Sequence, residues 1–318
     1  IDRGGVFAQL LGTVELLTPS ERKRVKGFII NKFRGDKSLL QSGLDFLEKK
    51  TGIPVLGVVP YMRLELPDED SLTERFCMKS GGRDIDIVVI RLSRISNFSD
   101  FDIFENIESL SLRYISSVEE FGEPDIVIIP GSKNTIAALI ILRENGLEAV
   151  IKRYAARGGT LIGICGGYQM LGYKIFDPEK LEGNIKEIRG MELLPVNTSL
   201  KNEKTLRQTR GTFGKIEGIL SPLSGMNYEG YEIHMGKSDE IFSSKGNIYG
   251  TYIHGIFDAE GIAETIVNTI ISKKGLSTGS INIKSEKEIR ENSYQKLAVN
   301  MKDAIDMDKI LEILSENT

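Results

Sequence analysis

Short runs of consecutive apolar residues recur along the chain, and each run ends in small or polar residues. They lie at 25–33, 53–60, 84–92, 125–135 and 159–167. Such short, almost wholly apolar runs are typical of parallel strands that are buried on both faces of a sheet. Apolar residues at helical spacing fill the intervals 38–52 and 136–158. The alternation predicts an α/β protein built on parallel sheets.

A polar, charged and glycine-rich stretch at 64–83 divides this pattern into two parts. We therefore expect a partial first domain over residues 1–80 and a second α/β domain over residues 81–318. Between 172 and 259 the pattern changes to short strands and turns, and two final helices are expected at 259–274 and 286–316. The chain opens on Ile1 instead of methionine, so we expect an N-terminal segment of the same protein to be missing.

Composition and charge exclude several classes of function. The chain has 41 Lys and Arg against 45 Asp and Glu, a formal net charge of −4, which gives no reason to expect a nucleic-acid partner. No apolar run approaches the roughly 18 residues that cross a bilayer, so no membrane segment is expected. The two cysteines, Cys77 and Cys165, have no metal-type spacing. They indicate a reducing, cytoplasmic environment and no metal site, with Cys77 incidental.

Cys165 follows an apolar strand and is surrounded by glycines in the segment LIGICGG. A sharp turn between a strand and a helix holds a nucleophile in a strained backbone conformation and needs neighbours without Cβ atoms. The N–H groups at the start of the following helix would favour a thiolate. We interpret Cys165 as a nucleophile, although most free cysteines are buried core residues.

A cysteine nucleophile requires a base, and the chain has only two histidines, His234 and His254. His254 ends an apolar strand in GTYIHGIFD and is the preferred candidate for a Cys–His pair. The loop IIPGSKNT could aim the amides of Gly131 and Ser132 at a tetrahedral intermediate, beside the amide of Gly166. Parallel strands bind ligands at their carboxyl ends, so the loops at Gly131 and Cys165 should face one crevice.

The chain also resembles a known family. The segments GICGGYQ, PGSKNT and YIHG are similar to class I glutamine amidotransferases of the cobyric acid synthase branch. The resemblance covers nearly the whole chain, through DRGGVFA, VKGFIINKFRGD, TGIPVLGVVPY, RLSRISNFSDFD and GYEIHMG. It implies the C-terminal half of a P-loop, dethiobiotin-synthetase-like parallel-sheet domain, followed by a flavodoxin-like amidotransferase domain.

The activity implied by the resemblance is amidation with ammonia taken from glutamine. Glutamine would be hydrolysed by Cys165 and His254, and the ammonia would amidate the b, d, e and g carboxylates of adenosylcobyrinic acid a,c-diamide in cobalamin biosynthesis. ATP and Mg²⁺ would serve the full-length enzyme. No G-x-x-x-x-G-K-[ST] phosphate loop occurs in the sequence, so we expect no tightly bound cofactor here and only the glutaminase half of the reaction.

The resemblance also implies roles for further residues. It places Gly131, Ser132 and Gly166 at the oxyanion, Gln169 and His234 at the glutamine, and Asp2, Asn31 and Lys32 on the nucleotide or substrate side. Many relatives carry a glutamate two residues after the histidine, where this chain has Ile256. Asp258 and Glu260 are nearby, but the group that orients His254 stays open.

Two other functions remain as alternatives. One is the sister enzyme, cobyrinic acid a,c-diamide synthase, whose segments corresponding to RLSRISNFSDFD and PGSKNT read differently. The other is a stand-alone cysteine hydrolase on the same fold, which Gln169 and the N-terminal residues disfavour.

Overall fold

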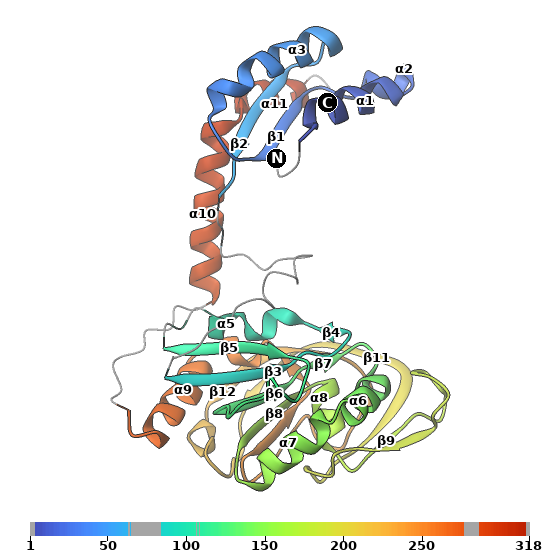
Figure 1. The fold of residues 1–318 in the computed structure, drawn as a ribbon, viewed down its shortest axis with the longest axis vertical. Helices are drawn as coiled ribbons and strands as arrows, with labels where there is room; N and C mark the ends of the chain where they lie inside the picture. The colour runs from blue at the N-terminus through green and yellow to red at the C-terminus, as the bar shows by residue number, and fades with distance from the viewer. Residues whose placement is uncertain are drawn as a thin grey trace. The chain divides into compact units, whose positions relative to one another are not determined.

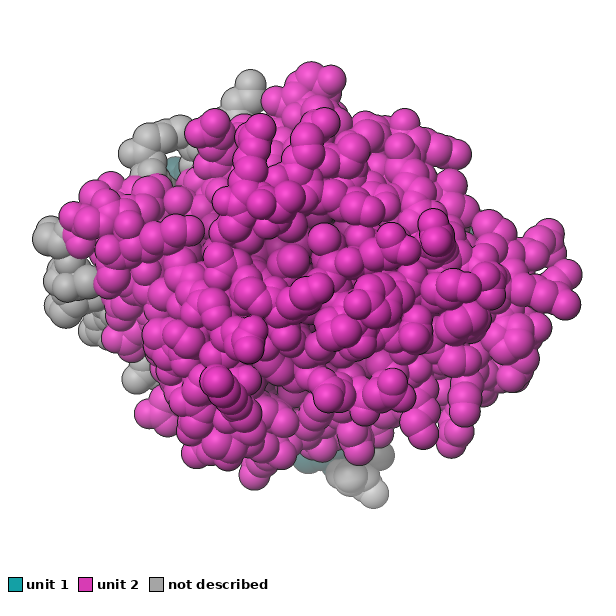
Figure 2. Space-filling model, turned by 90° about the horizontal axis from the view of Figure 1, so that it is seen from below, with its two compact units in different colours: residues 1–66, 287–318 teal, residues 67–286 magenta. Residues whose placement is uncertain are grey.

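The computed structural model describes residues 4–62, 64, 84–105, 107, 109–276 and 286–315. The chain forms two compact units, residues 1–66 together with 287–318, and residues 67–286 (Figure 2). Asp2, Cys77 and most of the polar stretch at 64–83 lie outside the described residues. Within the described part, no helix is both long and apolar enough to cross a membrane.

The first unit is built on two parallel strands (Figure 1). Its elements are α1 (Val6–Leu16), α2 (Pro19–Arg22), β1 (Phe28–Phe33), η1 (Lys37–Leu40), α3 (Gln41–Thr51) and β2 (Val55–Pro60). Val14, Phe28 and Leu47 bring α1, β1 and α3 into one buried cluster. Gly52 has a φ of 68° and ends α3 in the left-handed conformation that glycine adopts readily. The strands predicted at 25–33 and 53–60 and the helix predicted at 38–52 are confirmed.

The C-terminal helices differ from the prediction in number and in place. Two helices, α10 (Glu286–Ala304) and α11 (Met307–Ser315), replace the single helix expected at 286–316. They also group with the first unit instead of the second domain, which was expected to extend over residues 81–318. The backbone of Ile305 forms a β-bridge to Gly57 in β2, and the Asp306 N–H donates to the Leu56 carbonyl at 2.7 Å. These contacts with β2 interrupt the helix and join it to the first unit.

A six-stranded sheet forms the centre of the second unit, in the order β13-β14-β8-β6-β3-β5. All neighbouring pairs are parallel except β13 with β14. The strands are β3 (Ile85–Ile90), β5 (Leu110–Ile115), β6 (Ile126–Ile129), β8 (Thr160–Ile164), β13 (Phe242–Lys245) and β14 (Ile248–Thr251). The strands predicted within 84–92, 125–135 and 159–167 are therefore confirmed.

Helices and smaller sheets complete the second unit. The helical elements are η2 (Phe98–Phe101), α5 (Asp102–Glu105), α6 (Thr135–Glu144), α7 (Leu147–Ala156), α8 (Gly166–Leu171), η3 (Ser221–Leu223), η4 (Ile256–Asp258) and α9 (Ile262–Lys273). A second sheet has the order β10-β9-β11-β12-β15. Its strands are β9 (Lys174–Phe176), β10 (Glu187–Arg189), β11 (Asn197–Thr212), β12 (Asn227–Lys237) and β15 (Ile253–His254). At 16 and 11 residues, β11 and β12 are longer than the short strands predicted for this region.

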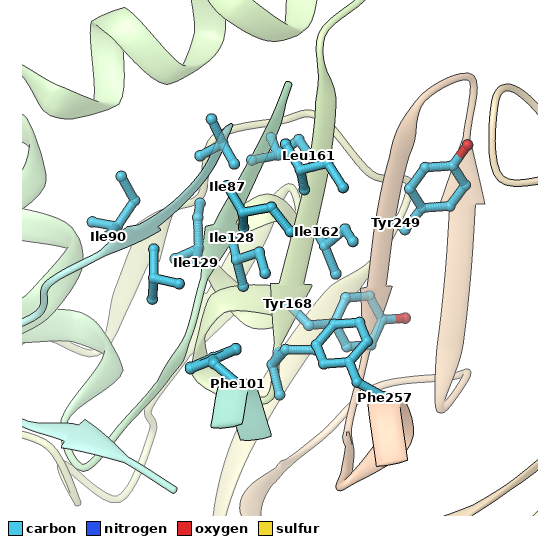
Figure 3. Close-up of a cluster of buried hydrophobic side chains, with 14 of the residues drawn as sticks. Ile87, Ile90, Phe101, Ile128, Ile129, Leu161, Ile162, Tyr168, Tyr249 and Phe257 are labelled. Atoms are coloured by element: carbon cyan, nitrogen blue, oxygen red, sulfur yellow. The ribbon is translucent and has the colours of Figure 1, made fainter. Parts of the chain in front are cut away.

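The apolar strands of the six-stranded sheet carry the main core, which fixes the sheet edge where the predicted site lies. Ile87, Ile128 and Leu161 of neighbouring strands are fully buried, and Tyr168 of α8 packs below them (Figure 3). Because β6, β8 and β14 run parallel, their carboxyl ends meet at one edge. The segments that begin at Gly131, Cys165 and Tyr252 all leave from this edge.

Candidate active site

Cys165 stands at the sharp turn where β8 ends and α8 begins, as predicted. Its φ of 51° and ψ of −105° are a strained conformation for a residue with a side chain. Its N–H donates to the Thr251 carbonyl at 2.8 Å, which holds the turn against β14. A Cβ on Gly167 would lie 2.0 Å from the Ile129 carbonyl oxygen. The glycine after the turn is therefore required by the close approach of two backbones.

His254 is completely buried and is hydrogen-bonded to a carboxylate from a distant part of the chain. Its Nδ1 lies 2.7 Å from Oδ2 of Asp100, and the Gly255 N–H donates to Oδ1 of Asp100 at 2.9 Å. Asp100 itself is only 2% exposed. The group that orients His254 is thus Asp100 and not Asp258 or Glu260, the two acidic residues near it in sequence.

Aromatic packing explains how Asp100 reaches a residue 154 positions away. Phe101 and Phe104, which follow Asp100, pack against Phe257 with ring centroids 6.4 and 5.0 Å apart. Figure 3 shows Phe101 and Phe257 at the edge of the apolar cluster. Because Phe257 lies three residues after His254, the same contact brings the carboxylate to the imidazole. The segment RISNFSDFD, which carries part of the family resemblance, contained the only sequence signal for Asp100.

The surroundings of His254 favour its protonated form. Burial alone would lower the pKa of His254, but the hydrogen bond that His254 donates to Asp100 and the nearby Cys165 outweigh burial and raise that pKa from 6.5 to about 10. Nε2 of His254 is buried and has no hydrogen-bond partner within the described residues. The imidazolium therefore directs its second N–H into the site beside Cys165, where a cation favours a thiolate.

The predicted oxyanion residues lie close to one another and to His254. A Cβ on Gly131 would lie 3.4 Å from Cε1 of His254, and a Cβ on Gly166 would lie 2.8 Å from the Ser132 amide nitrogen. The strand β7 (Gly131–Ser132) is held by antiparallel pairing with β4 (Ile95–Ser96). The backbone therefore brings Gly131, Ser132 and Gly166 together beside His254, while their role toward an oxyanion stays a prediction.

Gln169 and His234 both contact Tyr252, which lies two residues before His254. Gln169 is 3% exposed; its Oε1 accepts from the Thr135 hydroxyl at 2.9 Å, and its Nε2 donates to the Tyr252 hydroxyl at 3.3 Å. The ring of His234 stacks on Tyr252 with centroids 4.0 Å apart. Both side chains already have polar partners within the protein, and their contact with glutamine stays a prediction.

The residues predicted on the nucleotide side belong to the first unit. Asn31 and Lys32 lie in β1, where Oδ1 of Asn31 accepts from the Lys32 N–H at 2.8 Å. Lys32 has a φ of 54°, and the strand register is irregular at this point. A nucleotide contact at these residues stays a prediction. In the part of the chain that the structure describes, no group of three or more His, Cys, Asp or Glu side chains could hold a metal ion.

Comparison with known proteins gives two family matches. Residues 86–262 match the CobB/CobQ-like glutamine amidotransferase domain, and residues 1–72 match the CobQ/CobB/MinD/ParA nucleotide binding domain. The chain is 46% identical to a cobyric acid synthase of Lachnoclostridium phytofermentans, over 99% of this chain and 67% of that protein. It is also 46% identical to a cobyric acid synthase of Ruminiclostridium cellulolyticum, over 99% of this chain and 66% of that protein. The chain thus spans about two thirds of the length of these relatives.

Proposed function

This chain belongs to the CobB/CobQ-like glutamine amidotransferase family, and we propose that it hydrolyses glutamine to glutamate and ammonia at Cys165. The observation that carries this proposal is the arrangement at one sheet edge. A cysteine in a strained turn lies near a buried histidine whose Nδ1 is hydrogen-bonded to Asp100. Nucleophile, acid and orienting carboxylate are the parts that covalent hydrolysis of an amide requires.

In the first half of the reaction, the Cys165 thiolate attacks the carbon of the glutamine carboxamide. The new C–S bond places negative charge on the former carbonyl oxygen, toward which the amides near Gly131 and Gly166 would donate. His254 then gives the Nε2 proton to the nitrogen as the C–N bond breaks, and ammonia leaves. Asp100 stabilises the imidazolium and keeps the ring oriented throughout.

In the second half, water hydrolyses the γ-glutamyl thioester. His254, now neutral, takes a proton from the attacking water, and the same backbone amides hold the second oxyanion. The C–S bond breaks, glutamate leaves and Cys165 returns as a thiolate beside the imidazolium. Together the two halves convert glutamine and water to glutamate and ammonia. All other groups that take part belong to the chain itself.

The longer relatives support a proposal for the use of the ammonia. We assign it to amidation of the b, d, e and g carboxylates of adenosylcobyrinic acid a,c-diamide, each activated as an acyl phosphate by ATP with Mg²⁺. This part of the proposal rests on the relatives' name and on the nucleotide-binding match at residues 1–72. Asp2, Asn31 and Lys32 would lie on that side, whereas residues 86–262 supply the ammonia. The match at residues 1–72 also disfavours a stand-alone cysteine hydrolase.

The proposal is tested by trapping the covalent intermediate. Wild-type protein is mixed with radiolabelled glutamine, quenched in acid within one turnover, and the label is mapped by proteolysis. We expect a thioester on the peptide that contains Cys165, released by neutral hydroxylamine. His254→Ala should form it far more slowly. Label that persists in Cys165→Ala, or label that hydroxylamine does not release, would refute the assignment.

A further inference from the structure

We propose that Glu232 is a positioning residue of the thiol site, because its buried carboxylate holds His234 as a ring that donates from both nitrogens. The inference rests on the proposed glutamine hydrolysis, for which it names a further residue. Glu232 lies in β12, opposite Ile253 in β15 and opposite Arg207 in β11. It is therefore cross-strand to the residue that precedes His254.

The Glu232 carboxylate is 1% exposed and is surrounded by donors. Arg207 Nε lies 2.8 Å away, the Thr209 hydroxyl 2.6 Å and His234 Nε2 3.1 Å. Burial raises the pKa of Glu232, but these hydrogen bonds outweigh it and leave that pKa below its usual value. A buried carboxylate that stays ionised needs such partners, since an uncompensated buried charge is strongly destabilising.

Both ring nitrogens of His234 face groups that can only accept hydrogen bonds. Nδ1 lies 2.6 Å from the Gly236 carbonyl oxygen, and Nε2 lies 3.1 Å from Oε2 of the Glu232 carboxylate. A neutral imidazole carries one N–H and would turn a lone pair toward one of these oxygens. Both contacts are satisfied only when both nitrogens are protonated, with Glu232 as counter-ion. Arg207 and Tyr252 are the other titratable groups that this pair contacts.

The Glu232–His234 pair reaches the thiol by two routes. Ile233, between the two residues, places its carbonyl oxygen 3.8 Å from the Cys165 sulfur. The His234 ring stacks on Tyr252, whose hydroxyl accepts from Gln169 and lies 2.7 Å from the Ser238 hydroxyl. Without the carboxylate, the His234 ring could rotate. The positions of the Ile233 carbonyl and of the Tyr252 and Gln169 side chains would then be less well fixed.

The same geometry separates this pair from the catalytic one. His254 keeps Nε2 open toward the site, whereas both nitrogens of His234 are bound within the protein. His234 and Glu232 therefore have no group left to exchange a proton with substrate, and they act through the residues that they hold. Arg207, with 59% of its side chain exposed, is the solvent-facing end of the network.

Nitrogen NMR of the imidazoles tests the inference without any activity. The chain has only two histidines, so His254→Ala assigns both rings. In wild-type protein near neutral pH we expect His234 with both nitrogens protonated, and in Glu232→Gln with only one. A wild-type His234 ring with one protonated nitrogen would overturn the proposal, and this outcome does not require Glu232→Gln to fold.

Kinetics of glutamine hydrolysis test the link to the thiol. Glu232→Gln is expected to lower kcat/KM about 10- to 100-fold, as small misplacements of a reacting group do. The control is Glu229→Gln on the same strand, an exposed carboxylate 3.4 Å from Arg210, which should stay close to wild type. Equal rates for Glu232→Gln and wild type would refute the positioning role. A wild type without glutaminase activity would instead refute the proposed function. The NMR experiment would still test whether Glu232 keeps both nitrogens of His234 protonated.

Discussion

Replacing Cys165 with alanine is expected to lower the rate of glutamine hydrolysis by about 10⁴- to 10⁶-fold, as loss of a nucleophile does in other covalent hydrolases. Cys165 is the cysteine that the structure places at the sheet edge with His254, and no thioester can form without its sulfur. The residual rate would come from water attacking a glutamine that the amides near Gly131 and Gly166 still polarise. Release of ammonia, followed enzymatically, measures the rate.

The control for this substitution concerns the fold. Alanine removes only the sulfur, and the strained backbone at φ 51° is equally unfavourable for both residues, so the thermal unfolding midpoint should change little. A variant that is folded but retains a tenth or more of the wild-type rate would contradict the assignment of Cys165 as nucleophile.

Asp100→Asn is expected to lower kcat for glutamine hydrolysis by about 10²- to 10⁴-fold, the range seen when the carboxylate behind a catalytic histidine is neutralised. The amide still fills the space, but it no longer stabilises an imidazolium at His254. Burial lowers the pKa of His254, and the Asp100 charge opposes this effect. Removing that charge should therefore lower the pKa of His254. The fall in rate at alkaline pH should therefore move to lower pH than in the wild type.

The same pKa shift predicts a change in stability with pH. The pKa of His254 is raised from 6.5 to about 10 in the folded state, so its contribution is fully present below pH 6.5 and is lost as pH rises through about 10. Between pH 6.5 and about 10, the urea concentration at the unfolding midpoint should therefore fall less in Asp100→Asn than in wild type. Glu260→Gln, at an exposed carboxylate in the following loop, serves as control. Identical pH profiles for Asp100→Asn and wild type would contradict the role of Asp100.

Local sequence was enough to propose Cys165 and His254 as a pair, but it could not predict the carboxylate that is hydrogen-bonded to His254. The turn at Cys165 requires glycines close by in sequence, and a chain with two histidines leaves few candidates for a base. Asp100 lies in a different segment and reaches His254 only through the packing of Phe101 and Phe104 on Phe257. The spacing of apolar residues along the chain cannot predict such a contact, because the contact depends on the tertiary fold.

The C-terminal helices show a similar limit. A continuous helical pattern at 286–316 predicts one helix, yet backbone pairing of Ile305 with Gly57 divides it and attaches it to the first unit. The pattern of apolar residues cannot predict hydrogen bonds between backbones, because these bonds do not depend on side-chain type. The buried strands of the large sheet were predictable for the opposite reason, since burial on both faces dictates their composition.

Each histidine of the chain is paired with a buried carboxylate, and the two pairs differ in the way that their proposed roles require. Asp100 occupies one nitrogen of His254 and leaves the other for proton transfer. Glu232 and the Gly236 carbonyl occupy both nitrogens of His234. Because Glu232 and Ile253 are cross-strand neighbours, the Glu232–His234 pair lies next to the proposed catalytic histidine, His254.

The central claim is that Cys165 is a nucleophile for glutamine, and covalent labelling tests it most directly. The protein is treated with the glutamine analogue diazo-oxo-norleucine, and the adduct is mapped by mass spectrometry in wild type and in His254→Ala. The account predicts stoichiometric labelling at Cys165 that glutamine prevents and that is slower in the histidine variant. Labelling at Cys77, or labelling of Cys165 that glutamine does not prevent, would contradict it.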